Sequence, residues 1–217
     1  MKRYAYVFVL ATLVCCLAGC SDPADKVQKA AASDPNKTEP AKAPASGKDY
    51  TIRAGSKIGF IGSKVTASHN GGFKNFAGTI TVADGKIVGS PEVKIAMQSL
   101  FVDNQRLEGH LKSPDFFDVA KYPISTLNVT AIEPAGTQQK VTGNLALHGV
   151  TKSISFPADI QITDEAVKVK ADFSLNRRDF NINYPGMPND LIRDNVVIKL
   201  DVMATPGSPR PEDQLPN

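Results

Sequence analysis

The side chains best suited to acid–base or metal chemistry in this sequence are three histidines, His69, His110 and His148. Imidazole titrates near neutral pH and is a common zinc ligand. The three histidines lie far apart in the sequence, however, and lack the short local spacing that zinc ligands usually show. His148 also falls on the polar side of its strand-like segment, so we expect it to face outward. The pattern predicts hydrogen-bonding histidines at loop edges and no metal site.

The segment "HLKSPDFFDVAKYP" brings a histidine, a serine and several charged residues close together. Ser113 beside His110 and Asp115 has the composition of a catalytic triad, but a triad is defined by spatial roles, and residues on one turn seldom converge. Asp115 and Asp118 are better interpreted as charges at the start of a helical turn. We therefore predict no catalytic residue. The alternative is an enzyme for lipidic or amide substrates in which His69 or His110 is the general base.

A glycine-rich stretch, "SHNGGFKNFAG", would suit a phosphate cradle only if a helix began directly after it. Strand-like residues flank it on both sides instead, which favours a hairpin turn. Asn70, Gly71 and Gly72 would then supply the positive φ angles that such a turn needs.

Alternation of apolar and polar residues dominates the rest of the chain. In "ISFPADIQI" and "VKVKADFSL" almost every second side chain is large and apolar, which is typical of half-buried antiparallel strands. Short turn signals such as "ADGK", "EPAGTQ" and "TDEA" separate these segments. We predict about eight strands, near 56–66, 73–83, 90–98, 122–132, 139–148, 152–162, 166–176 and 196–204. Eight strands close into a barrel or form a sandwich.

One segment breaks this alternation. In "DNQRLEGHLKS", Leu107 and Leu111 lie four residues apart among polar residues, which predicts a short amphipathic helix with Asp103 as its N-cap. Pro114 ends or restarts the helix, so the helical segment is expected over about 103–118. It should lie over one end or side of the barrel.

The first residues have the features of an export signal. Lys2 and Arg3 precede an apolar run, and "LAGC" closes it at Cys20, which resembles the bacterial lipobox, where the signal is cut before the cysteine. We expect residues 1–19 to be removed and Cys20 to be lipidated, which would anchor the chain in a membrane. Ser21 after the cysteine resembles an outer-membrane sorting signal. The expected location is therefore the cell envelope, on the periplasmic side of the outer membrane.

Composition divides the remaining chain into a tether, a domain and a tail. Residues 20–48 are rich in Ala, Lys, Asp, Pro and Ser, with Val27 as the only large aliphatic residue, so we predict a disordered tether. Residues 49–206 form one folded domain, and residues 207–217 read as a disordered tail. Without the signal the chain carries 23 basic and 22 acidic side chains. Such a balance argues against nucleic acid as a partner.

Five successive blocks of the sequence resemble the YceI-like family of bacterial envelope proteins. The blocks are "GFKNFAGTI", "HLKSPDFFDVAKYPIST", "VTGNLALHGVTKSISFPADI", "ADFSLNRRDFNINYP" and "LIRDNVVIKLDVMA", in order between residues 50 and 204. The resemblance implies a single antiparallel eight-stranded barrel like that of a lipocalin, with a helical segment over it and a long apolar channel. It also implies binding of long-chain amphiphiles, either polyisoprenoid quinones or fatty-acid amides, and no enzymatic activity. No cofactor is expected, although an isoprenoid quinone would be a possible bound ligand.

Apolar residues in the matching blocks are the candidates for the channel lining. They are Phe73, Phe76, Ile80, Val93, Ile95, Met97, Leu107, Leu111, Phe116, Phe117, Phe156, Phe173, Leu175 and Phe180. The sequence departs from the common family pattern at Lys64, where many members have a histidine, and at Asn181, where the usual residue is glycine.

The sequence thus predicts a carrier or sequestering protein for one long apolar chain. The alternatives are a structural envelope lipoprotein whose barrel is filled by its own side chains, and the enzyme considered above. The sequence leaves open whether the domain forms a homodimer.

Overall fold

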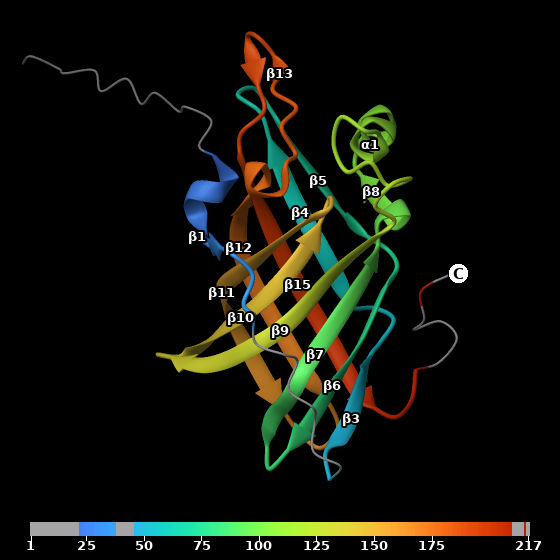
Figure 1. The fold of residues 1–217 in the computed structure, drawn as a ribbon, viewed down its shortest axis with the longest axis vertical. Coiled ribbons are helices and arrows are strands. Elements are labelled where there is room, and N and C mark those ends of the chain that lie inside the picture. Colours follow the sequence, from blue (N-terminus) through green and yellow to red (C-terminus); the bar gives the residue numbers. More distant parts are fainter. Residues whose placement is uncertain (1–21, 38–45, 210–214, 216–217) are drawn as a thin grey trace, which may run out of the picture.

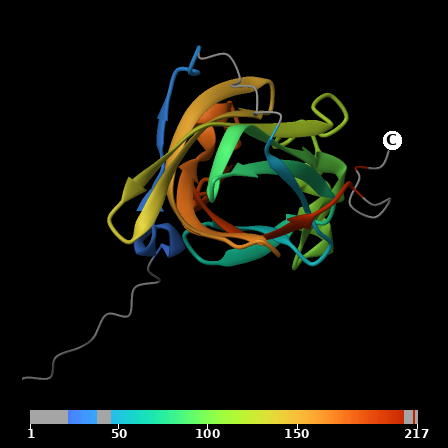
Figure 2. The same ribbon diagram turned by 90° about the horizontal axis from the view of Figure 1, so that it is seen from below.

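A computed structural model describes residues 22–37, 46–209 and 215 of the chain. Its main feature is a closed antiparallel barrel (Figures 1 and 2). Five strands run its length: β9 (Ile124–Ala135), β10 (Gln138–Leu147), β11 (Val150–Ile162), β12 (Val167–Asn176) and β15 (Asn195–Pro206). Pairing of β12 with β15 closes the ring.

Each of the other three strand positions in the barrel wall is occupied by two shorter strands, a lower one and an upper one in the view of Figure 1. They are β3 (Lys48–Ile52) with β4 (Lys57–Ser63), β6 (Phe76–Ala83) with β5 (Ser68–Phe73), and β7 (Lys86–Ala96) with β8 (Leu100–Val102). The lower strands pair in the order β15, β3, β6, β7, β9, whereas the upper strands pair in the order β15, β4, β5, β8. When each lower and upper pair is counted as one strand, the barrel has eight strands, and the predicted fold class is confirmed. Each predicted strand overlaps an observed one.

The glycine-rich stretch is part of a strand, so the hairpin turn predicted at Asn70–Gly72 is wrong. These residues lie in β5, paired with both β4 and β8, and neither glycine has a positive φ angle. Glycine is needed here because neighbouring groups pack directly against the β5 backbone. A Cβ on Gly71 would lie 2.4 Å from the Phe60 ring and 2.6 Å from the carbonyl oxygen of Phe101.

Helix α1 (Gln105–Lys112) continues from β8, which pairs only with β5 among the described strands. Its N-cap is Asn104, whose side chain accepts a hydrogen bond from the Leu107 amide at 3.0 Å, and not Asp103 as predicted. Asp103 instead accepts from the Asn70 amide at 2.7 Å and contacts His69 Nδ1, also at 2.7 Å. The helix is shorter than the predicted 103–118 because Pro114 follows its C-cap.

The interior side chains form two clusters along the barrel. The lower cluster, as we call it, fills the end of the barrel near β3 and consists of Tyr50, Ile52, Ile80, Val82, Val167, Val202 and Ala204. The Tyr50 hydroxyl donates a hydrogen bond to the Thr163 carbonyl oxygen at 3.0 Å, which satisfies its one polar atom. The other cluster lies in the wall formed by β10, β11 and β12, where the rings of Phe156 and Phe173 stack with centroids 4.2 Å apart.

Residues 22–37 are ordered against the barrel, so the predicted disordered tether is wrong for this part of residues 20–48. Strands β11 and β12 pair only between 159–162 and 167–170, and the chain fills the seam above. We call η1 (Pro23–Lys26), β1 (Gln28–Lys29) and β2 (Ala31–Ser33) the N-terminal strap. It lies against the outside of the barrel wall (Figure 2).

Main-chain pairing holds the N-terminal strap in the seam. Strand β1 runs parallel to β12, and β2 runs antiparallel to β11. Ala30, between them, is 4 % exposed and donates its amide to the Ser174 carbonyl oxygen at 2.8 Å. Composition could not reveal this role, because the strap uses backbone groups and two small buried side chains, Ala24 and Ala30, instead of a hydrophobic face. Cys20, residues 38–45 and most of the predicted tail lie outside the described residues.

Two short elements complete the upper end. The 3-10 turn η3 (Arg177–Phe180) follows β12, and β13 (Gly186–Met187) and β14 (Asp190–Leu191) form a small hairpin that projects at the top of Figure 1. A short turn, η2 (Met97–Ser99), separates β7 from β8. None of the helices in the described part of the chain has the length and apolar character required to cross a bilayer.

Candidate ligand-binding cavity

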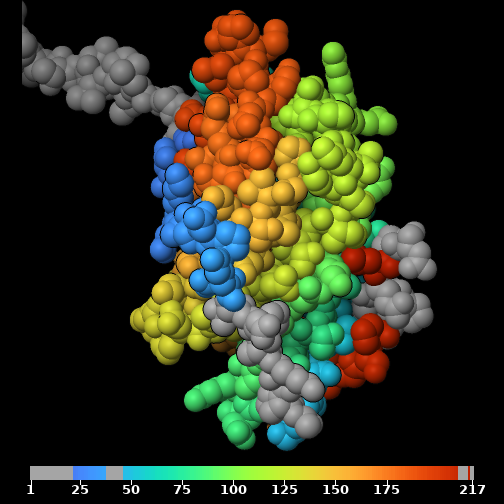
Figure 3. Space-filling model, in the orientation of Figure 1, coloured from blue at the N-terminus to red at the C-terminus, as the bar shows by residue number. Residues whose placement is uncertain are grey.

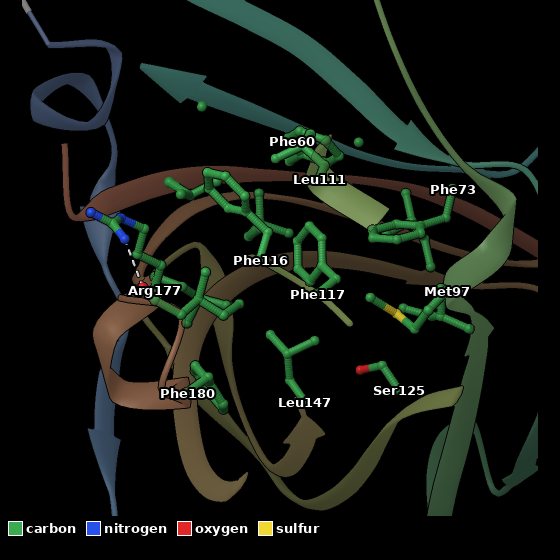
Figure 4. Close-up of a pocket in the computed structure, with 18 of the residues that line it drawn as sticks. Phe60, Phe73, Met97, Leu111, Phe116, Phe117, Ser125, Leu147, Arg177 and Phe180 are labelled. Atoms are coloured by element: carbon green, nitrogen blue, oxygen red, sulfur yellow. Dashed lines mark hydrogen bonds between the residues drawn. The ribbon is translucent and has the colours of Figure 1, made fainter. Parts of the chain in front are cut away.

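The upper half of the barrel is hollow. It encloses a cavity of about 950 Å³, at the upper end of the range for ligand pockets in proteins. Figure 4 shows aromatic and aliphatic side chains from several strands and from the segment after α1 pointing into this space. Twelve of the fourteen candidate lining residues contribute to the wall: Phe73, Val93, Ile95, Met97, Leu107, Leu111, Phe116, Phe117, Phe156, Phe173, Leu175 and Phe180.

Phe76 and Ile80 lie outside the cavity lining. Ile80 belongs to the lower cluster and is 6 % exposed, and Phe76 packs against that cluster. Both residues lie on β6, which contributes to the lower half of the barrel, whereas Phe73 lies on β5 in the upper half. Alternation predicts which side chains point inward, but it does not give their height along the barrel axis.

Several lining residues were not among the candidates. They are Ile58 and Phe60 on β4, Leu127 on β9, Leu145 and Leu147 on β10, Ile154 on β11, Val196, Ile198, Leu200 and Val202 on β15, and Ile182, Met187 and Ile192 near the β13–β14 hairpin. The strand residues have the same alternation that predicted their strands, so that signal could have identified them. The residues near the hairpin belong to no alternating pattern, and only the fold brings them to the cavity.

The segment around α1 closes the gap between β8 and β9. Phe117 meets Phe73 edge to face, with ring centroids 6.3 Å apart. Phe116 is 5 % exposed and lies 5.1 Å from the ring of Tyr184, which comes from the chain between η3 and β13. The ring of His110 contacts both Phe116 and Tyr184, at 5.0 and 4.8 Å. Aromatic contacts thus join α1 and the segment after it to the chain between η3 and β13.

A buried cation, Arg177, supports the wall beneath the hairpin. Its guanidinium donates to the Ile182 carbonyl oxygen at 2.6 Å and to the Arg193 carbonyl oxygen at 3.1 Å, and Nη2 pairs with Asp194 at 3.2 Å. Burial lowers the pKa of Arg177, but the adjacent Asp194 opposes this shift. Because its donors face these fixed partners, Arg177 acts as a structural brace for the chain around the mouth of the cavity.

Asn181, at the position where the resemblance implies a glycine, has a backbone conformation that is typical of glycine. Its φ angle is +58°, in the left-handed region that asparagine tolerates better than most residues. Asn181 forms the C-cap of η3, and the preceding Phe180 is 1 % exposed at the cavity wall.

The polar groups of the cavity lie mainly at its mouth, and most have partners within the chain. Lys64 pairs with Asp190, and its hydrogen bond is the main cause that lowers the pKa of that carboxyl group. The pKa of Asp103 is lowered first by the Asn70 amide and then by His69. Arg106 lies exposed at the rim, on the first turn of α1.

The histidines do not assemble a reaction centre. His69 contacts Asp103, and His110 Nε2 contacts Asp115 Oδ2 at 3.0 Å, but the Ser113 hydroxyl donates to the His110 main-chain oxygen and not to its imidazole. His148 lies in the turn between β10 and β11, where Nδ1 contacts the Phe180 carbonyl oxygen at 3.1 Å. Across residues 22–37 and 46–209, no three His, Cys, Asp or Glu side chains are grouped as metal ligands would be.

Similarity to proteins of known sequence covers the barrel. A UPF0312 protein of Pseudomonas syringae pv. tomato is 35 % identical in a match of 152 residues that covers 64 % of this chain and 78 % of the relative. Protein YceI of Salmonella arizonae is 32 % identical over 120 residues, covering 52 % of this chain and 62 % of that protein.

Two solved structures share the fold. BcnA of Burkholderia cenocepacia aligns with a TM-score of 0.63 at 24 % identity, covering 70 % of this chain and 98 % of BcnA. A polyisoprenoid binding domain from Saccharophagus degradans, implicated in plant cell wall breakdown, aligns with a TM-score of 0.61 at 18 % identity, covering 73 % and 98 %. The profile of the YceI-like domain matches residues 50–204, the whole span of the barrel strands but for their outermost residues. This chain therefore belongs to the YceI-like domain family.

Proposed function

We propose that this protein binds one long-chain amphiphile, a polyisoprenoid quinone or a fatty-acid amide, and carries or sequesters it in the cell envelope. The observation that supports the proposal is the 950 Å³ cavity, whose wall is made almost entirely of aliphatic and aromatic side chains. Water in such a space finds few hydrogen-bond partners, so displacing it with an apolar chain is favourable. Burial contributes about 25 cal/mol per Å² of apolar surface.

The shape of the site favours an amphiphile over a fully apolar molecule. The closed end is apolar, and the polar side chains Lys64, His69 and Arg106 lie at the mouth. A ligand with a long tail and a small polar head would match this gradient. The Saccharophagus degradans domain of the same fold is a polyisoprenoid binding domain, which agrees with this ligand class. A barrel filled by its own side chains matches only the lower cluster.

The cavity is suited to binding a ligand and not to catalysis. The His–Asp contacts lie at the rim, and neither imidazole is hydrogen-bonded to a hydroxyl or thiol group within the described residues. A reaction would also need an activated nucleophile or water held against the ligand.

Native mass spectrometry of the full chain isolated from its host tests ligand binding. We expect one adduct per chain, and organic extraction should release a quinone, an isoprenoid or a fatty amide. Adding that compound to stripped protein should raise the melting temperature, because a ligand that binds only the folded state stabilises it. An unliganded mass together with an unchanged melting temperature would contradict the proposal.

The proposed location in the envelope rests on the export signal and on Cys20 in "LAGC". Lipidation there would anchor the protein to the periplasmic side of the outer membrane. Fractionation of cells that express the wild type or Cys20→Ser tests this: only the wild type should be cleaved at the lipobox and carry acyl chains by mass spectrometry. Equal processing of both chains would exclude lipidation at Cys20.

A further inference from the structure

Three exposed apolar side chains gather at the mouth end of the barrel. Six large hydrophobic side chains are exposed among the described residues, and Met187, Val65 and Leu191 are the most exposed of them, at 64, 51 and 50 %. We call these three the apolar tip. Val65 lies in the loop between β4 and β5, and the other two lie in the β13–β14 hairpin.

The loop and the hairpin of the apolar tip are held together. The Val65 amide donates to the Leu191 carbonyl oxygen at 3.2 Å, Lys64 pairs with Asp190, and the Thr66 hydroxyl lies 3.0 Å from the same carboxylate. The apolar side chains are therefore presented by a braced structure and not by a loose loop.

The apolar tip is continuous with the interior of the cavity. Met187 lines the cavity although it is the most exposed apolar side chain, and Ile192, next to Leu191, also lines it. Figure 3 shows the hairpin projecting from the same end of the molecule as the α1 region. An apolar path thus runs from the wall of the cavity to the outer surface.

We infer that the apolar tip inserts into the surface of a lipid bilayer, so that an amphiphile passes between bilayer and cavity without crossing water. The passage of the amphiphile rests on the proposed function. The insertion of the apolar tip does not depend on it. Three side chains are too few for a stable protein interface, which needs about 20–30 residues on each side. Exposed apolar side chains at the same end of the barrel as an exposed cation such as Arg106 suit the headgroup region of a membrane.

The path of the chain agrees with this orientation. Asp22, the first described residue, accepts a hydrogen bond from the Ser63 hydroxyl at 3.2 Å and pairs with Arg193 at 3.4 Å. Ser63 ends β4 at the cavity mouth. The described chain therefore begins at the same end of the barrel as the apolar tip.

Insertion can be measured by tryptophan fluorescence, because the sequence contains no Trp. The full chains with Leu191→Trp or Met203→Trp are mixed with vesicles of phosphatidylethanolamine and phosphatidylglycerol that contain brominated lipid. Met203 is also an exposed apolar residue, at 40 %, but lies on β15 near the closed end. We expect a blue shift and quenching for Leu191→Trp and neither for Met203→Trp. Unquenched emission from Leu191→Trp, or equal quenching of both, would overturn insertion.

A transfer assay separates this inference from the proposed function. Uptake of a fluorescent isoprenoid quinone analogue from the vesicles is followed for the wild type, Val65→Asp/Leu191→Asp and Met203→Asp; neither Val65 nor Leu191 lines the cavity. We expect the double variant to take it up at least fivefold more slowly but to the same final occupancy, and Met203→Asp to match the wild type. Equal rates for all three would overturn the role of the apolar tip. If no protein takes up the analogue while Leu191→Trp is quenched, insertion stands and the proposed ligand class fails.

Discussion

At the scale of single residues, glycines in β5 set how closely the upper strands approach. Gly71→Ala would place a methyl group against the Phe60 ring and the Phe101 carbonyl oxygen. The backbone oxygen cannot move away freely, so we expect a loss of about 1–3 kcal/mol in the free energy of unfolding. Urea denaturation measures this loss. Gly62→Ala is the matched control, because a Cβ there meets nothing within 4 Å and the φ angle is not positive; an equal loss in the control would contradict the packing explanation.

A single side chain can also test whether the cavity is the binding site. Ile198 on β15 lines the cavity, whereas the next residue, Lys199, is exposed on the outer face. Ile198→Trp should occupy ligand space and weaken binding at least tenfold, which corresponds to about 1.4 kcal/mol. Titration with the extracted ligand gives the dissociation constants, and circular dichroism checks the fold. Lys199→Trp should bind like the wild type, and equal weakening in both variants would place the ligand elsewhere.

At the scale of elements, Asp103 ties the start of α1 to β5 through the Asn70 amide and His69. These contacts lower the pKa of the Asp103 carboxyl group below its usual value. A lowered pKa in the folded state means that the carboxylate stabilises the fold above the unfolded pKa of about 3.9, and that this contribution is lost as pH falls through the folded pKa.

The variant Asp103→Asn should therefore be less stable than the wild type near neutral pH, and the difference should shrink on acidification below about pH 4. Melting temperatures measured between pH 7 and pH 3 test this. Asp84→Asn in the β6–β7 turn is the control, since it changes the same charge away from α1. A difference between Asp103→Asn and wild type that is constant with pH would show that the carboxylate charge is not involved.

A substitution at one buried residue can test whether the N-terminal strap stabilises the barrel. Ala30 is buried in the seam, whereas Ala32, two residues later, is exposed. Ala30→Glu should force the strap out of the seam, because the longer charged side chain has neither space nor a partner there. We expect hydrogen exchange to accelerate at 171–175 on β12, and the free energy of unfolding to fall by about 1–3 kcal/mol. Ala32→Glu should leave both unchanged; unaltered exchange in Ala30→Glu would show that the barrel does not need the strap.

At the scale of the whole molecule, the strands of the barrel can be predicted from the sequence, but the cavity inside the barrel cannot. Period-two alternation in segments such as "VKVKADFSL" reports which side chains face inward, whatever the details of pairing. Whether inward side chains meet is decided by their size and their height along the axis. Ile80 and Phe73 both point inward, yet one helps to fill the closed end and the other lines open space.

The features that the sequence did not predict depend on partners far away along the chain. Gly71 and Gly72 resemble a turn locally, and only their neighbours Phe60 and Phe101 show why they lie in a strand. Asp103 and Asn104 are both good N-cap residues, and the choice between them depends on His69 and Asn70 across the sheet. The strap is ordered by the unpaired edges of β11 and β12, which no property of residues 22–37 reveals.

Because the lower cluster closes one end of the barrel, the cavity would limit the length of the ligand chain that can be buried. The proposed ligand would enter tail first and leave through the same opening, and any part of its chain that does not fit above Tyr50 and Ile80 would remain outside. Each added isoprene unit should therefore tighten binding until the space is full, after which further units should change the dissociation constant little. Titration with isoprenoid quinones of increasing chain length would show this plateau in the dissociation constant. The chain length at which the plateau begins would give the number of isoprene units that the cavity holds.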